Sequence, residues 1–159
     1  GHTSPDLDYF STTALTGTIR DAATNSATLT LPNPGSAGSL GANKALIIDT
    51  TAPTVSSMAA ITANGSYGAG STIDIRLTFS EVVNVSGTPR FTVETGATDG
   101  IANYLSGSGT SQLTFRYTVG AGENSADLDH AGVSSLVLNG GTINDVALNA
   151  ATLARSQVT

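Results

Sequence analysis

Two stretches decide the fold class, Thr72-Ile73-Asp74-Ile75-Arg76-Leu77-Thr78-Phe79 and Gln112-Leu113-Thr114-Phe115-Arg116-Tyr117-Thr118-Val119. In both, apolar and polar residues alternate, which is the period of a β-strand that buries one face. The alternation predicts that the apolar positions of the two strands share one core. These positions are Ile73, Ile75, Leu77, Phe79, Leu113, Phe115, Tyr117 and Val119.

Shorter stretches of the same kind are separated by clusters of turn residues such as Ser106-Gly107-Ser108-Gly109. Many short strands at a spacing of about 8–12 residues are typical of a β-sandwich or barrel. We therefore expect an all-β fold, with at most a single helical turn in 6–15 and in 127–136. The further strands are predicted at 27–31, 45–48, 54–57, 82–85, 90–94, 101–105, 134–138 and 141–143.

The composition excludes several classes of protein. Charged residues are 11% of the 159, the net charge is −6, and Lys44 is the one lysine. Such a chain lacks the cations that neutralise phosphates, so we expect no nucleic-acid partner. The absence of cysteine excludes a zinc-thiolate site, and no apolar run approaches the ~20 residues of a membrane span. A surface rich in Thr, Ser, Asn and Gly without disulfides fits an extracellular protein on a bacterial exterior.

The sequence repeats itself. Residues 4–8 match 125–129 at an offset of 121, and residues 17–21 match 141–145 at an offset of 124, in a register that continues to residues 29 and 153. The chain is therefore expected to hold about one and a third repeat units. Residues 1–50 are predicted to be the C-terminal part of a preceding repeat. Residues 52–159 are predicted to be a β-sandwich without its own last strand.

The repeat resembles the bacterial immunoglobulin-like and cadherin-like modules that stand in tandem in large secreted adhesins. The resemblance covers almost the whole chain, and it implies an Ig-like Greek-key β-sandwich, a place on the bacterial cell surface, a spacing or adhesive role, and calcium at the module joints. One departure is that His130 and Ala131 follow the second Asp-Leu-Asp, where the first copy has Tyr9 and Phe10. The resemblance is carried by residues 40–44, 49–54, 79–83, 104–115, 124–129 and 139–143.

Two Asp-Leu-Asp motifs predict calcium as a cofactor. In an extended segment, carboxylates two residues apart point the same way, and Ca²⁺ takes hard oxygen ligands of this kind. The alternative is a solvated acidic turn. The pairs Asp21/Asn25 and Asp145/Asn149 also recur, and we interpret them first as turn-forming residues, with metal binding as the alternative. The predicted calcium ligands are Asp127, Asp129, Glu81, Asp49, Asp6 and Asp8.

The chain is not expected to be an enzyme. A Ser/His/Asp site would have to use His130 beside Asp129, and the Gly-x-Ser-x-Gly motif of a nucleophile elbow is absent. The function expected instead is that of a structural or adhesive module. The alternative is a carbohydrate-binding module, in which Tyr67 and Tyr104 would stack on sugars. The expected partners are copies of the chain or adjacent repeats, or a glycan or protein on a cell surface.

The strand at 44–48 has a special place in this interpretation. The second unit is expected to be without its own copy of this strand, which would leave an open apolar edge. An edge of this kind pairs readily with another chain. The strand is therefore predicted to complete the sandwich of residues 52–155, either within one chain or in a neighbour by donor-strand complementation. Repeated head-to-tail insertion would produce a filament.

Overall fold

The computed structural model describes residues 3–4 and 6–153, which fall into two compact units, Gly1–Thr51 and Ala52–Thr159. Residues 1–2, 5 and 154–159, which belong to the predicted segments 1–50 and 52–159, lie outside the described residues. Within the described residues, no helix has the length and the apolar character needed to cross a membrane.

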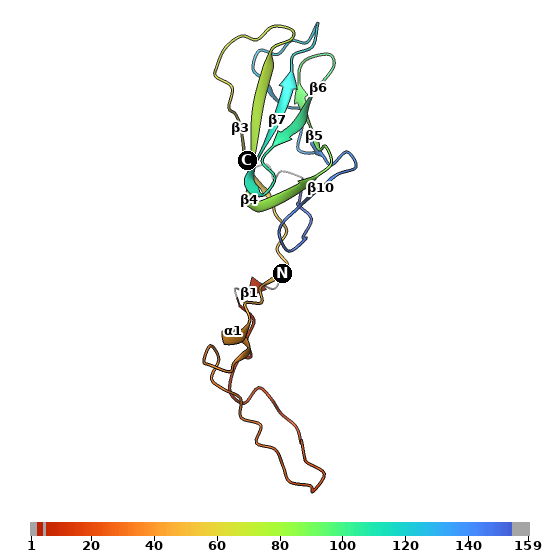
Figure 1. Cartoon of the computed structure of the whole chain (residues 1–159). Coiled ribbons are helices and arrows are strands. Elements are labelled where there is room, and N and C mark those ends of the chain that lie inside the picture. Colours follow the sequence, from red (N-terminus) through yellow and green to blue (C-terminus); the bar gives the residue numbers. More distant parts are fainter. Residues whose placement is uncertain (1–2, 5, 154–159) are drawn as a thin grey trace. The chain divides into compact units, whose positions relative to one another are not determined.

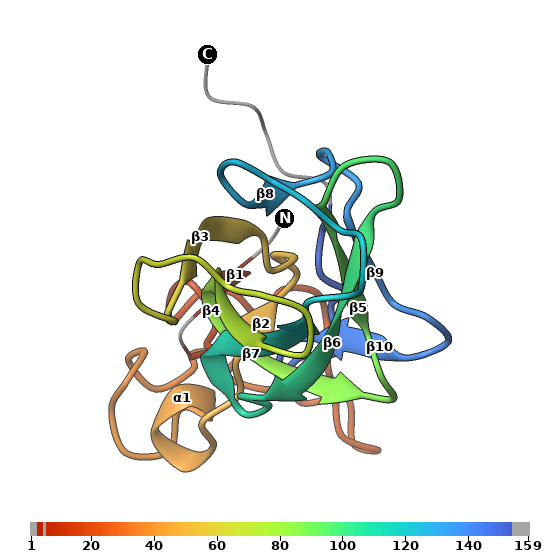
Figure 2. The same cartoon turned by 90° about the horizontal axis from the view of Figure 1, so that it is seen from above.

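The second unit is built from one curled antiparallel sheet. The strands follow one another in the order β10-β4-β7-β6-β5-β8, while β3 pairs with β4 and β9 pairs with β5. Seen from above, β3 and β8 lie at the two ends of the curled sheet and on the same side of it (Figure 2). The strands of this unit are β3 (Val55–Ala60), β4 (Thr72–Ser86), β5 (Arg90–Glu94), β6 (Gly100–Ser106), β7 (Thr110–Thr118), β8 (Asp129–His130), β9 (Leu136–Val137) and β10 (Thr142–Asn144).

The core of this unit lies where β4 pairs with β7. Ile75 is opposite Phe115 and Leu77 is opposite Leu113, so both strands direct their apolar residues to one face. Phe115 and Leu113 are completely buried. The predicted core is confirmed for all of its residues except Val119, which is partly buried against it.

The strand β4 is longer than the sequence pattern predicts. The expected strands 72–79 and 82–85 form one strand of 15 residues, because a bulge between Thr78 and Val83 bends the chain without ending it (Figure 1). Before the bulge β4 pairs with β7, and near its end it pairs with β10. A bulge of this kind is what lets a sheet curl.

A tight turn joins β6 to β7. Gly107 has a φ of +113°, and a Cβ at this position would collide with the carbonyl oxygen of Gln112. Glycine is required here both by the backbone conformation and by the close approach of the next strand.

The first unit holds little regular structure. It contains β1 (Thr3–Ser4), α1 (Leu40–Asn43) and β2 (Ile48–Asp49), and β1 pairs antiparallel with β2. The strand predicted at 45–48 is thus reduced to residues 48–49, and the one predicted at 27–31 is absent among the described residues. The helix α1 was not predicted. It is four residues long, and Ser39 caps its N-terminus: the Ser39 hydroxyl accepts a hydrogen bond from the Ala42 N–H.

The described chain is nearly all β, as the sequence predicts, and α1 is its single helix. Where the sequence allowed a single helical turn in each copy, the structure has a hydrogen-bonded turn that is not helical. In the first, the Ala14 N–H donates to the Ser11 carbonyl (3.1 Å), and in the second the Ser135 N–H donates to the Gly132 carbonyl (3.0 Å). The two turns stand at corresponding positions of the repeat.

Candidate functional site

The two copies of the repeated hairpin have the same hydrogen bonds. The Asn25 N–H donates to Asp21 Oδ1 (2.9 Å) and its side-chain amide to Oδ2 (2.9 Å). In the second copy the Asn149 N–H donates to Asp145 Oδ1 (2.8 Å) and its amide to Oδ2 (2.8 Å). The interpretation of both pairs as turn-forming residues is therefore confirmed.

The backbone of the hairpin repeats as well. The Ala27 N–H donates to the Ile19 carbonyl (2.8 Å), and the Ala151 N–H donates to the Ile143 carbonyl (2.9 Å). One residue of each loop has a positive φ, 67° in Thr24 and 69° in Leu148. Neither residue is a glycine, so the Asp–Asn bonds hold the backbone in a region that these side chains rarely adopt.

Asp6 and Asp8 bind the backbone of their own unit. Asp8 Oδ2 accepts from the Gly35 N–H (2.9 Å) and Asp6 Oδ1 accepts from the Leu46 N–H (3.1 Å). Desolvation raises the pKa of Asp8, but hydrogen bonds from Gly35 and Tyr9 N–H groups, with smaller ones from Ser39 and Gly41, lower it below its usual value overall. Asp6 therefore links the start of the unit to the segment before β2, and Asp8 links it to the turn at Gly35.

Both carboxylates converge on Gly41. A Cβ at this residue would lie 2.9 Å from Asp8 Oδ2 and 3.3 Å from Asp6 Oδ2. The short helix α1 can approach the Asp-Leu-Asp motif this closely because residue 41 has no side chain.

Asp127 and Asp129, the corresponding pair in the second unit, are exposed. Asp129 Oδ1 lies 2.7 Å from the Nδ1 of His130 and accepts from its backbone N–H, also at 2.7 Å. Among residues 3–4 and 6–153, no group of three converging acidic or histidine ligands includes Asp127 or Asp129. Calcium at this pair stays a prediction.

The remaining predicted ligands are placed as follows. Asp49 ends β2 and accepts a hydrogen bond from the Thr51 N–H (2.9 Å). Glu81 lies in β4, and one of its carboxylate oxygens is within 4.8 Å of a carboxylate oxygen of Asp145. Sequence reasoning placed Asp145 in a turn and did not expect it beside Glu81, because the two residues are brought together only by the pairing of β4 with β10.

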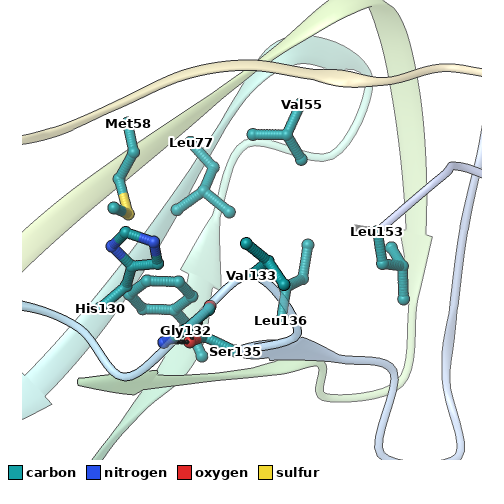
Figure 3. A pocket seen from close by; sticks show the side chains of 10 residues that line it. Val55, Met58, Leu77, His130, Gly132, Val133, Ser135, Leu136 and Leu153 are labelled. Atoms are coloured by element: carbon teal, nitrogen blue, oxygen red, sulfur yellow. Dashed lines mark hydrogen bonds between the residues drawn. The ribbon is translucent and has the colours of Figure 1, made fainter. Parts of the chain in front are cut away.

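A shallow apolar groove opens in the second unit (Figure 3). Met58 of β3 and His130 of β8 stand close to each other at one end of it, so the groove runs between the two ends of the curled sheet. The core residues Leu77 and Phe91 form part of its floor. Its other lining residues are Val55, Gly132, Val133, Ser135, Leu136 and Leu153.

Ser135 and His130 line the same groove, and Asp129 contacts the His130 ring. No sequence motif marks Ser135 as a candidate. Its hydroxyl donates to the Gly132 carbonyl (2.5 Å) and accepts from the Gly132 N–H (2.8 Å). The hydroxyl proton is therefore directed at a backbone carbonyl and away from the imidazole, which is not the arrangement that activates a serine nucleophile.

A buried tyrosine lies at the end of the core where β4 begins, opposite Ile73. Tyr117 is 2% exposed and its hydroxyl donates to the carboxylate of Glu123. Burial, together with this hydrogen bond and the charge of Glu123, raises the pKa of Tyr117 to about 12. The same hydrogen bond lowers the pKa of Glu123. The pair closes the core against solvent and lies outside the groove.

Comparison with known proteins identifies no relative: no family model, no curated protein and no solved structure matches this chain. The site is therefore defined by its own geometry.

Proposed function

We propose that this chain is a non-enzymatic structural or adhesive module from a tandem-repeat protein of a bacterial surface or fibre. The observation that carries the proposal is the duplicated hairpin, which has the same Asp–Asn network at 21–25 and at 145–149. A segment that recurs with unchanged hydrogen bonds in a chain of this length is typical of proteins built by stacking one unit. An extracellular place is supported by the acidic, cysteine-free composition.

The finer part of the proposal is that the repeat unit is an Ig-like β-sandwich. Two features support it. The sheet of the second unit curls until its ends face one groove, and Thr54, directly before β3, forms a parallel bridge with Thr152. Both are what a sandwich requires when its first and last strands meet across the core.

Calcium belongs to the proposal as a stiffening ion. Carboxylates gathered by folding repel one another until a cation is bound, so the ion would stabilise the native state. The test is thermal unfolding with calcium and then with excess chelator. A rise in melting temperature that is lost in the Asp127→Ala/Asp129→Ala variant supports binding at that pair. An unchanged melting temperature, or an equal rise in the variant, contradicts it.

The alternative is a carbohydrate-binding module. Tyr67 is 37% exposed and could offer one ring face. Tyr104, however, packs edge-on against Phe115 at 5.9 Å, and its hydroxyl accepts from the Ser108 N–H. A platform of two stacked rings is therefore not favoured.

Analytical ultracentrifugation and electron microscopy separate the two functions. Concentration-dependent dimers, rods or filaments support the structural module. A chain that stays monomeric and gives one clear glycan-array signal, lost in Tyr67→Ala, would instead support the carbohydrate-binding module.

A further inference from the structure

The local structure of the first unit repeats that of the second well beyond the Asp–Asn hairpin. In each Asp-Leu-Asp segment, the preceding serine hydroxyl donates to the carbonyl of the first aspartate at 2.8 Å, and the second aspartate accepts from the backbone N–H that follows it. The next turn also recurs, at 11–14 and at 132–135. The two units can therefore be compared residue by residue. The equivalent pairs are Ser4 and Ser125, Asp6 and Asp127, Asp8 and Asp129, Ser11 and Gly132, and Ala14 and Ser135.

Apolar residues at equivalent positions differ sharply in exposure. Leu15 is 42% exposed, whereas Leu136, which takes its place in the second unit, is 5% exposed. Ile19 and Leu7 are exposed as well, although their counterparts are buried in the core or packed against it. The first unit thus presents to solvent the side chains with which the second unit covers a core. The counterparts of Ile19 and Leu7 are Ile143 and Leu128.

In the second unit, the cover for these side chains comes from the strands of the sheet. Ile143 of β10 is opposite Val85 of β4, and Leu136 of β9 is opposite Phe91 of β5. β10 lies beside the end of β4 (Figure 1). The repeat register does not match these partner strands to any part of residues 1–51.

We propose that the first unit binds the body of another repeat of the same kind and covers its core as residues 125–153 cover that of the second unit. By the body we mean the segment equivalent to residues 52–124, which holds β3 to β7. The inference rests on the proposed function, because it takes both units as parts of one repeated design. It goes further by naming the docking face, the partner strands and the register.

The register follows from the pairing in the second unit. Ile19 would stand opposite the residue equivalent to Val85, and Leu15 opposite the residue equivalent to Phe91. Both side chains would lose most of their exposure, and this burial favours binding. The loop between the two positions is three residues shorter in the first unit. The register is therefore tested at Ile19, inside the hairpin that matches without a gap.

The end of the hairpin would also meet the β3 side of the body. In the second unit, Thr152 donates its N–H to the Pro53 carbonyl (2.8 Å) and forms a parallel bridge with Thr54. Thr28 holds the position of Thr152 in the first unit. Its N–H would therefore bond the carbonyl equivalent to that of Pro53, so that the docked unit spans the sheet from β3 to β5.

The partner is not the body at residues 52–124 of this chain or of a second copy. There β4 is already paired with β10, and β5 with β8 and β9. A competing hairpin from outside would have to displace one that is joined to its body and therefore has a high effective concentration. A body joined directly ahead of the first unit needs no displacement, and it follows the order of the second unit, in which the hairpin comes after the body.

The first experiment joins such a body to the chain, so that a second copy of residues 52–124 directly precedes residues 4–159. Hydrogen exchange, followed by mass spectrometry, is measured in this fusion and in the 159-residue chain. Peptides that cover the hairpin 17–29 are expected to exchange at least about a hundredfold more slowly in the fusion, because they become part of a packed sheet. Equal exchange in the two proteins would overturn the proposal.

Exchange of β7 shows whether the added body folds. The peptide 110–118 is present twice in the fusion, so two folded bodies give one slowly exchanging population. An unfolded added body would contribute a second, fast population. That result would also overturn the proposal, because the first unit would then fail to cover the body as residues 125–153 do.

Two charge substitutions in the fusion test the docking face. Ile19→Asp should return the hairpin 17–29 to fast exchange, because the charge would be buried opposite β4. The matched control is Thr24→Asp, since Thr24 corresponds to the exposed Leu148 and aspartate tolerates the positive φ of this residue. The control should keep the slow exchange. The same exchange in both variants would contradict the assigned face.

The second experiment tests the register with a disulfide, in a chain that has no native cysteine. In the fusion, Ile19→Cys is combined with Val85→Cys either in the added body or in the original one. Opposite residues of an antiparallel pair have Cα atoms about 4.5–5.5 Å apart, which suits a disulfide. Closure is expected with the added body alone, because the original Val85 is opposite Ile143. Closure with the original body, or between separate molecules, would overturn the proposed partner.

Failure of this inference can be told apart from failure of the proposed function. If the hairpin stays unprotected in the fusion while the 159-residue chain forms rods or filaments, the assigned partner is wrong and the structural module stands. If the chain is monomeric and gives one glycan signal that Tyr67→Ala removes, the proposed function fails, and exchange in the fusion alone decides the docking.

Discussion

Ile19 and Ile143 hold the same position in two copies of one hairpin, yet Ile19 is 51% exposed and Ile143 is 1% exposed. The hydrogen bonds within the two hairpins are the same. What differs is the neighbour: Ile143 lies in β10 and is opposite Val85 of β4, whereas the hairpin of the first unit has no such strand among its described pairings.

The comparison separates what forms the hairpin from what stabilises it. The Asp–Asn network is local and closes the loop in both copies, while burial is supplied by strands from elsewhere in the unit. The same holds across the first unit, where Ser39 is the only described residue that is fully buried. The exposed apolar residues of the first unit include Leu7, Phe10, Leu15, Ile19, Leu40, Leu46, Ile47 and Ile48.

The largest difference is expected between two phenylalanines. Phe115 is fully buried in the second unit and Phe10 is 87% exposed in the first. Phe115→Ala should lower the free energy of unfolding by about 3–5 kcal/mol, through lost burial and the cavity left behind. Phe10→Ala should change it by less than about 0.5 kcal/mol. Urea unfolding followed by circular dichroism measures both, and a small effect of Phe115→Ala would contradict the assigned core.

The two isoleucines test the same contrast within one hairpin. Ile143→Ala should cost about 2–5 kcal/mol because its side chain fills the core beside β4. Ile19→Ala should cost less than about 0.5 kcal/mol in the isolated chain. Equal costs would mean that Ile19 is covered in solution, and that the two units differ less than their exposures indicate.

The hairpin network itself should give a smaller contrast. Asp145 is 2% exposed, and its removal would take away the side-chain acceptor of the partly buried Asn149 N–H. Asp145→Ala is expected to cost about 1–3 kcal/mol, and Asp21→Ala less, because water can replace the acceptor at an exposed loop. Urea unfolding of the two variants, with Asp145→Asn as a control that keeps one acceptor, measures the difference.

The sequence carries enough information for the centre of the sheet and too little for its edges. The period-2 pattern of 72–79 and 112–119 depends only on which face is buried, so β4 and β7 are predicted with their core residues. The bulge in β4 has no such signature. The sequence therefore predicts a break after Phe79, where the strand in fact continues. The groove arises from the curl of the whole sheet, which no local pattern reports.

The candidate ligands show the same limit. Asp6 and Asp8 look alike as carboxylates in the sequence, but their partners are backbone N–H groups 40 and 27 residues away. Asp21 and Asn25, by contrast, are four residues apart, and their role in a turn could be predicted because the bonds that define it are local.

The smallest contrast concerns two tyrosines and appears only in alkali. Burial and Glu123 raise the pKa of Tyr117 from 10.0 to about 12, and desolvation and Asp8 also raise the pKa of Tyr9. A tyrosine whose pKa is higher in the folded state favours folding fully below pH 10, and this contribution is lost as the pH rises toward about 12. Between these values the unfolded chain ionises at Tyr117 and the folded chain does not, so the wild type should lose stability there.

Absorbance at the tyrosinate band should show a late step near pH 12 that Tyr117→Phe removes and Tyr9→Phe leaves in place. A late step that survives Tyr117→Phe would mean that another tyrosine is the buried one, and that the core closes differently at the Glu123 end.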